Sequence, residues 1–379
     1  MSTAPLEPTG KPIQVPTGRA GAGRQTLRFR PPYRQAIKRL TQSEPRLEDL
    51  VLTFPGLLFA LATGYGRAES RRDALERIDS GASLRQAAEC LGVPWWMRYL
   101  PPEAFAEPLY ALLDGPEVQR RIVNHIPPDI GFLPHWLRSV MLANAIAGES
   151  FALWLASRLK GRPRTSDRIL PLAAWAWFSS HPETRGHALV RCPFEPAMSL
   201  RAGMEEADTW RKRIDLDAAI GDGVADVWYD ACTHAGLDFV PLRTTEDFIL
   251  EAGLMDNCLD QFAPKMVRQA TRIVSVRRAG RPVADLEIGP HEDDASMPVI
   301  EQLRGPANRR VNAEVWQAVY GWLARQTPRS LAPTPVTSRR FQQRRRGIWQ
   351  PLEEAVTVPP AALALRDYLR SHEVIALRG

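Results

Sequence analysis

The sequence predicts an α+β protein: a mostly α-helical N-terminal region followed by a small α+β domain with a short antiparallel sheet. Between residues 34 and 240, apolar residues recur at steps of three and four, the spacing of one face of a helix. After residue 240 the pattern changes to short alternating or β-branched runs separated by glycine and proline. The 379 residues, of which 44% are hydrophobic, are enough to bury a sizeable core and to form two or three domains.

Residues 1–33 are expected to be a disordered basic arm, because proline and glycine recur there and apolar residues are sparse. Residues 34–240 form the predicted helical domain, in which proline clusters mark the helix ends. The run at 83–94, with its Leu-Gly step, is similar to the first helix and turn of a helix-turn-helix. The next residues, 95–100, are mostly apolar, whereas a recognition helix needs polar side chains that read base edges. A packed helical hairpin is therefore favoured.

The predicted α+β domain spans residues 241–327. Its strands are expected to form a meander over 273–277, 283–288 and 299–304, with a tight first turn around Gly280. A helix over 245–259 precedes the strands, and a helix over 312–325 follows them, with Asn312 or Asn308 as its N-cap. Residues 328–379 are expected to be a proline- and arginine-rich linker that ends in a short helix over 352–371.

Basic residues are concentrated in two segments of a chain whose net charge is +6. Residues 1–40 carry eight basic residues and one acidic residue, and residues 339–346 carry five arginines and no acidic residue. Their composition predicts flexible arms, which often neutralise phosphates. Phe341 and Trp349 flank the second cluster and are candidates for stacking on bases. A solubilising tail and an acidic protein partner are the alternatives. The candidate nucleic-acid-binding residues are Arg28, Arg30, Arg34, Arg339, Arg340, Arg344, Arg345 and Arg346.

The cysteines argue against a metal site. None of Cys90, Cys192, Cys232 and Cys258 has the C-x-x-C spacing or the histidine neighbours of a zinc site, and four cysteines are too few for a disulfide framework. The N-terminus lacks the apolar core of a secretory signal, and the longest apolar runs are too short to span a bilayer. We expect a cytoplasmic, reduced protein with no membrane span, no metal and no cofactor.

One candidate site lies on the helix expected at 245–259. Glu251, Met255 and Cys258 recur at steps of four and three, so they are expected to share one helical face. A carboxylate beside a thiol raises the pKa of the thiol, so a nucleophilic cysteine would need a histidine that no motif places. The alternative is a small cysteine buried in a core helix.

A second candidate site is one face of the predicted sheet. Residues two apart on a strand share a face, and polar residues fill alternate positions on all three strands. The expected alternatives are the solvated side of a half-buried sheet and a polar groove for phosphate or a substrate. The residues of this face are Ser275, Arg277, Asp285, Glu287, Gln302 and Arg304.

From about residue 241 to 322, a fifth of the chain, the sequence resembles the PcfJ-like proteins of conjugative plasmids and other mobile elements. The resemblance rests on Pro241-Leu-Arg-Thr, on Glu251-x-x-x-Met255-x-x-Cys258, on the two following strands, and on Gln302-x-Arg304-Gly-x-x-Asn308. The family has no settled biochemical activity, so the resemblance implies a mobile-element context rather than a reaction.

The sequence departs from the family pattern at four positions. Ala252 stands in place of glycine, Asn257 in place of histidine, Phe262 in place of tyrosine, and Asp285 in place of a frequent threonine. Asparagine forms hydrogen bonds but takes up no proton at neutral pH. Any reaction that used the family histidine as a base or ligand is therefore lost or altered in this chain.

Three functions are consistent with the sequence. The first is a nucleic-acid-associated accessory protein of a mobile element, with DNA or RNA and other mobile-element proteins as its partners. The second is an enzyme in which Glu251 and Glu287 form an acid/base pair beside Cys258. The third is a scaffold in a larger complex. The motif residues expected to make polar contacts are Asn257, Arg277, Gln302, Arg304 and Asn308.

Overall fold

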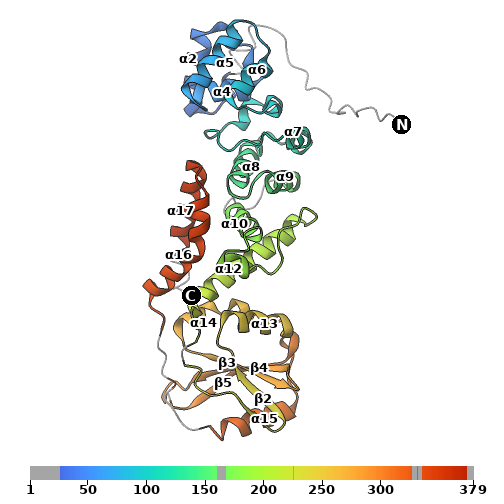
Figure 1. The fold of residues 1–379 in the computed structure, drawn as a ribbon, viewed down its shortest axis with the longest axis vertical. Helices are drawn as coiled ribbons and strands as arrows, with labels where there is room; N and C mark the ends of the chain where they lie inside the picture. The colour runs from blue at the N-terminus through green and yellow to red at the C-terminus, as the bar shows by residue number, and fades with distance from the viewer. Residues whose placement is uncertain are drawn as a thin grey trace, which may run out of the picture. The chain divides into compact units, whose positions relative to one another are not determined.

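The computed structural model describes residues 26–159, 168–224, 226–294, 296–326, 331 and 335–373. The chain divides into two compact units, Met1–Ser166 and Asp167–Gly379. Helices precede a five-stranded antiparallel sheet, which confirms the predicted α+β class (Figure 1). The second unit includes helices before residue 221, which the sequence pattern groups with the helical region.

The first unit is built from short helices, several of which begin with a proline in the first turn, where the missing N–H has no intrahelical partner to lose. Its core is rich in aromatic side chains, with Phe29, Phe59 and Phe105 in mutual contact. The elements are α2 (Pro31–Ser43), η1 (Pro45–Leu47), α3 (Leu50–Thr53), α4 (Pro55–Thr63), α5 (Ala68–Asp79), α6 (Leu84–Leu91), η2 (Trp95–Tyr99), η3 (Pro102–Ala104), α7 (Pro116–Ile122), η4 (Val123–His125), α8 (Leu133–Ala147) and α9 (Glu149–Arg158).

The helix-turn-helix alternative fails at its second helix. Ser83 and Gln86 form a capping box at the start of α6, and Gly92 ends this helix in a left-handed conformation. The next element, η2, is a short 3₁₀ helix rather than a recognition helix. Trp96 is buried and donates a 2.9 Å hydrogen bond to the Leu113 carbonyl, so it is not available to a base edge.

Part of the expected N-terminal arm is folded. Residues 1–25 lie outside the described residues, but Phe29 is fully buried against Phe59. Arg28 forms a bidentate ion pair with Glu103, at 2.5 and 2.9 Å. The prediction of disorder is therefore wrong for residues 26–33, because one phenylalanine ties this segment to the core.

The second unit begins with helices that pack around the long helix α12. Trp349 on α16 lies against Trp210 on α12 and Phe178 on α10, with ring centroids 5.2 and 6.2 Å away. No helix in the described part of the chain is long and apolar enough to cross a membrane. The helices outside the sheet region are α10 (Ile169–Ser179), α11 (Arg185–Ala188), α12 (Leu200–Ile220), α16 (Ser338–Ala355) and α17 (Pro359–Glu373).

The sheet is a meander in the order β1-β2-β3-β4-β5, antiparallel throughout. Helix α15 covers one face with Val315, Val319 and Trp322, while α13 and α14 lie on the other side (Figure 1). Asn312 caps α15, as predicted, by accepting a hydrogen bond from the Val315 N–H at 3.0 Å. The elements are β1 (Cys232–His234), β2 (Leu237–Pro241), α13 (Thr245–Met255), η6 (Leu259–Gln261), α14 (Ala263–Arg268), β3 (Arg272–Arg278), β4 (Arg281–Pro290), β5 (Pro298–Arg304), η7 (Pro306–Asn308) and α15 (Ala313–Leu323).

The C-terminal segment is more helical than the sequence predicts. Residues 327–330 and 332–334 of the expected linker lie outside the described residues, and Leu331 is buried in the core beneath the sheet. Helix α16 begins at Ser338 rather than at 352, with Thr337 as its N-cap. The arginine cluster therefore lies on a helix and not on a flexible arm.

Candidate functional site

Helix α13 brings Glu251 to the sheet. Thr244 caps the helix: its hydroxyl accepts a hydrogen bond from the Asp247 N–H, and the Asp247 carboxylate accepts one from the Thr244 N–H. A carboxylate occupies one of the inward positions that the helical pattern otherwise gives to apolar side chains. The buried inward face comprises Phe248, Glu251, Ala252 and Met255.

The end of α13 changes the expected position of Cys258. Asp256 takes a left-handed φ of 50°, so the helix stops at Met255 and the chain turns away. Cys258 lies beyond the turn and is exposed. The expectation that Glu251 and Cys258 share a helical face is wrong, and so is the expectation of a cysteine buried in a core helix.

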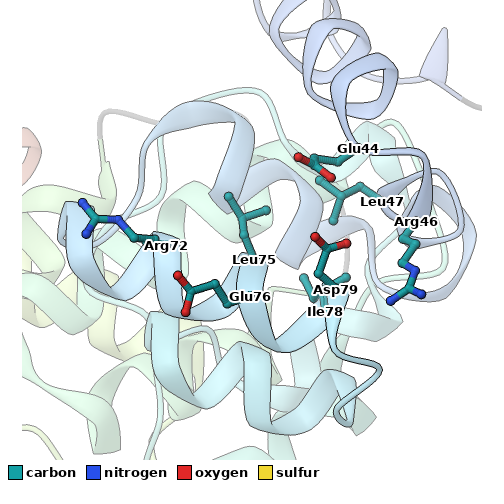
Figure 2. A pocket seen from close by; sticks show the side chains of 8 residues that line it. All are labelled: Glu44, Arg46, Leu47, Arg72, Leu75, Glu76, Ile78 and Asp79. Atoms are coloured by element: carbon teal, nitrogen blue, oxygen red, sulfur yellow. The ribbon is translucent and has the colours of Figure 1, made fainter.

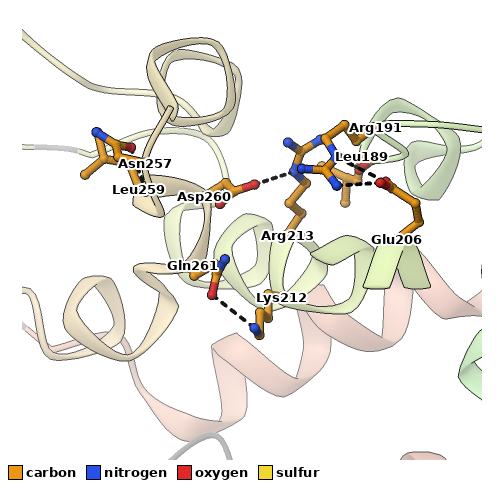
Figure 3. Close-up of polar contacts among 9 residues, drawn as sticks. All are labelled: Leu189, Arg191, Glu206, Lys212, Arg213, Asn257, Leu259, Asp260 and Gln261. Carbon is orange, nitrogen blue, oxygen red and sulfur yellow. Dashed lines mark hydrogen bonds and ion pairs between the residues drawn. The ribbon is translucent and has the colours of Figure 1, made fainter. Parts of the chain in front are cut away.

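The turn after α13 is held by polar contacts to α12, seen in Figure 3. Arg213 on α12 forms a buried ion pair with Asp260 at 2.9 Å. Lys212 donates a hydrogen bond to Gln261 at 3.0 Å. Asn257 accepts one from the Leu259 N–H at 3.1 Å, which fixes the orientation of its amide. The loop that carries Asn257 is therefore held by side chains of α12 and by a hydrogen bond within the loop.

The polar face of the sheet is buried. Ser275 on β3 is the register partner of Asp285 on β4, and Asp285 is the partner of Arg304 on β5. Ser275, Asp285 and Glu287 are 0%, 6% and 4% exposed. The expectation of a solvated face is wrong for β3 and β4, because α13 and α14 cover it (Figure 1).

Glu251 lies at the centre of this buried face. It is fully buried and accepts hydrogen bonds from the Ser275 hydroxyl at 2.5 Å and from Arg277 Nη2 at 2.9 Å. Arg277 Nε also donates to Ser275 Oγ at 2.9 Å. The Arg277 side chain is 27% exposed, so its guanidinium joins the buried carboxylate to the surface. This arrangement satisfies a charge that would otherwise be costly to bury.

Asp285 is the second carboxyl group of the site. Asn257 Nδ2 donates a 2.6 Å hydrogen bond to Asp285 Oδ2, whereas the buried Oδ1 has no hydrogen-bond donor. Burial, and then the charge and hydrogen bond of Glu251, raise the pKa of Asp285 from 3.8 to about 8. Asp285 is therefore protonated at neutral pH, beside the carboxylate that Arg277 binds.

Glu287 belongs to a separate cluster on the same strand. Its Oε1 accepts hydrogen bonds from Lys265 Nζ at 2.6 Å and from the Thr271 hydroxyl at 3.1 Å. The expected acid/base pair of Glu251 and Glu287 is therefore not the pair that forms. Asp285 is the carboxyl partner of Glu251, because Glu287 lies two residues, about 7 Å, further along the strand.

The other motif residues stay outside the buried cluster. Gln302, Arg304 and Asn308 are all exposed. Gln302 and Arg304 lie on β5, the edge strand, opposite Glu287 and Asp285 respectively. Asn308 has a left-handed φ of 57° in the turn that follows.

The sequence hypotheses placed Asp285 on the polar strand face but not in the acid/base pair, and they gave Lys265 and Thr271 no role in a site. Asp285 is one of the alternating polar residues of its strand, so the sequence predicted which face of the strand its side chain occupies. Its pairing with Glu251 depends on how α13 lies across the sheet. Lys265 and Thr271 carried no signal, because neither belongs to a motif or to one of the alternating polar runs on the predicted strands.

The arginines of α16 divide into buried and exposed sets. Arg345 is buried and forms a 3.0 Å ion pair with Asp215 on α12, and Arg344 lies 3.6 Å from Asp222. Phe341 and Trp349 are fully buried, so the predicted base stacking by these residues is wrong. The exposed arginines are Arg339, Arg340 and Arg346. None of these three forms an ion pair with another residue that the structure describes.

Two arginines of the first unit are also committed to the fold. Arg28 is paired with Glu103, and Arg34 donates hydrogen bonds to the Leu27 and Phe29 carbonyls. Arg30 is exposed. Of the predicted phosphate contacts in this segment, only Arg30 keeps a fully exposed side chain.

A small hollow lies in the first unit, away from the carboxyl pair in sequence. It has a volume of about 190 Å³ and is lined by Glu44 at the end of α2 and by residues of η1 and α5 (Figure 2). Three acidic and two basic side chains surround it, which gives it no single charge preference. The lining residues are Glu44, Arg46, Leu47, Arg72, Leu75, Glu76, Ile78 and Asp79.

The described residues contain no cluster of three or more histidine, cysteine or acidic side chains that could hold a metal ion. Comparisons with protein families, with curated proteins and with solved structures found no match to this chain.

Proposed function

We propose that the chain is a nucleic-acid-associated accessory protein that contacts the phosphate backbone. The observation that carries the proposal is the exposed face of α16. Arg339, Arg340 and Arg346 project from a helix whose opposite face is buried against α10 and α12. A rigid helix loses less conformational entropy on binding than a flexible arm, so its guanidinium groups are better prepared to meet phosphates.

Helix α2 offers a second basic surface. Arg30, Lys38 and Arg39 are exposed, and the helix itself contains no acidic residue. Exposed arginine and lysine side chains that form no ion pair with a described residue raise the local positive potential and steer polyanions. This surface supports the same function as α16.

The mobile-element context of the proposal comes from the PcfJ-like resemblance of residues 241–322. We infer that the partners are DNA or RNA and other proteins of such an element. The resemblance supports the context only, and the chemistry of binding is argued from the arginines.

The test is fluorescence anisotropy of the full chain with labelled single-stranded DNA, duplex DNA and RNA across a salt series. Binding should weaken as salt rises, with a slope near 0.7–0.9 per phosphate contacted. The variant R339Q/R340Q/R346Q should reduce that slope. Its control is R85Q/R121Q/R201Q, which removes the same charge from exposed ion pairs elsewhere. No binding by the wild-type chain at low salt would refute the proposal.

A second candidate function is acid–base catalysis, which the Glu251–Asp285 pair favours. A protonated carboxyl group beside a carboxylate provides an acid and a base in the same place. Arg277 would hold an anionic substrate at the exposed edge of the pair. End-labelled nucleic acid incubated with the wild-type chain and with E251Q tests this candidate, and it fails for nucleic-acid substrates when neither protein yields products.

A further inference from the structure

The antiparallel register collects arginines at one end of the sheet. Strand β3 finishes there, β4 begins there, and β5 finishes beside β4. The loop after β5 continues along the start of β4: Gly305 N–H donates to the Arg309 carbonyl at 2.8 Å, and a Cβ on Gly305 would lie 3.6 Å from the Val283 carbonyl. Six arginines lie at this end: Arg277, Arg278, Arg281, Arg304, Arg309 and Arg310.

Two of the six are neutralised within the fold and four are not. Arg277 is bound to Glu251, and Arg278 forms an ion pair with Glu314 at 2.6 Å. The other four are exposed, and none of them forms an ion pair with another described residue. These four, called the sheet-end arginines here, are Arg281, Arg304, Arg309 and Arg310.

The opposite end of the same sheet is acidic. The connection from β4 to β5 carries Glu292, Asp293 and Asp294, all exposed. Evenly mixed charges would be sufficient for solubility. The four unpaired arginines at one end and the three exposed acidic residues at the other instead create a directed potential, which orients a charged partner.

We propose that the sheet-end arginines form a phosphate-binding surface for nucleic acid. All four are arginine rather than lysine, and the planar guanidinium matches phosphate oxygens with two parallel hydrogen bonds. They are fixed to strand ends and to a short hydrogen-bonded loop. This inference rests on the proposed nucleic-acid function and adds a contact surface that is independent of α16.

The test compares the full-length wild-type chain with R281Q/R304Q/R309Q/R310Q in the same anisotropy titrations. The matched control is R85Q/R121Q/R138Q/R201Q, which also removes four charges, but from exposed arginines that are already paired with acids. Between 50 and 200 mM salt, the sheet-end variant should lose less affinity than the wild type. The difference should be about 12-fold if two phosphate contacts are lost and about 150-fold if four are lost.

The outcomes separate this inference from the proposed function. Wild-type binding with equal salt slopes in the sheet-end variant and its control overturns the inference and leaves the α16 proposal standing. No wild-type binding overturns both. The wild type could bind a labelled poly-glutamate peptide as tightly as nucleic acid, and the sheet-end variant could weaken both equally. That result would assign the surface to acidic proteins and overturn the nucleic-acid assignment. A reduced slope in the sheet-end variant alone, with weaker binding to poly-glutamate, supports the inference.

Discussion

Replacing Asp285 with asparagine should make the protein more stable at neutral pH. Asp285 Oδ2 accepts a hydrogen bond from Asn257, and Asp285 keeps its proton at neutral pH because it is buried next to Glu251. The asparagine Oδ1 can accept from Asn257, and its Nδ2 can donate to Glu251, so the neutral amide reproduces both contacts without binding a proton.

The magnitude follows from the pKa. The carboxyl ionises near 3.8 in an unfolded chain and near 8 in the fold. One pKa unit corresponds to about 1.4 kcal/mol, so keeping Asp285 protonated at pH 7 costs the folded state about 4 kcal/mol. Because the folded-state pKa is raised, the stability from this group is complete below pH 3.8 and is lost as the pH rises to about 8. The variant escapes this loss.

The assay is thermal unfolding of the wild type and D285N at intervals from pH 5 to 9. The stability difference should favour D285N and grow with pH up to about 8, then level off. For a unit of this size, 3–4 kcal/mol raises Tm by about 6–15 °C. Asp285→Ala is the control: it also lacks the titrating carboxyl group but removes both hydrogen bonds, so it should be less stable than D285N. A D285N protein that is less stable than the wild type, or a difference that does not change with pH, would refute the reasoning.

Three further predictions concern single side chains. E251Q leaves Arg277 without its buried counter-charge, so it should lower the free energy of unfolding by about 2–4 kcal/mol. An unchanged Tm in thermal unfolding would contradict a stabilising ion pair between Glu251 and Arg277. R345Q should lower stability by a similar amount because it breaks a buried ion pair. R346Q alters an exposed side chain one residue away, so it should change the free energy of unfolding by less than about 0.5 kcal/mol. Equal effects of R345Q and R346Q would contradict the division of α16 into buried and exposed arginines. C258S should remove one fast-reacting thiol in a native Ellman titration without altering Tm; an unchanged thiol count would show that Cys258 is covered.

The fold class could be predicted because hydrophobic periodicity is a local property. The change from helical spacing to alternation after residue 240 located β3, β4 and β5, and Asn312 was recognisable as a cap from its position before an apolar run. Strands β1 and β2 were missed, because they lie before the predicted boundary and were assigned to the helical domain. The end of α13 was not recognisable. Asp256 adopts a left-handed conformation there without a glycine, so the sequence contains no stop signal at that point.

The arginine cluster of α16 shows a different limit. Five arginines in eight residues predict an exposed, flexible segment on composition. The helix forms because Phe341, Ile348 and Leu352 recur at steps that include Arg345, which completes the buried face. The carboxylate that allows this arginine to be buried is Asp215, 130 residues earlier in the chain. Long-range pairing of this kind is set by packing, and composition alone does not reveal it.

The buried carboxyl pair also bears on the choice between the two candidate functions. The buried pair lowers the stability of the fold by several kcal/mol, and an isosteric asparagine at position 285 would avoid that cost. Proteins retain such costly buried groups mainly where function requires them. If the pair serves only to seat α13, D285N should gain stability and bind nucleic acid with the wild-type salt dependence. If the proton on Asp285 takes part in function, D285N should gain stability and lose activity. The same variant therefore separates a nucleic-acid-binding scaffold from an acid–base site, and a gain in both stability and function would leave the pair without a role in either.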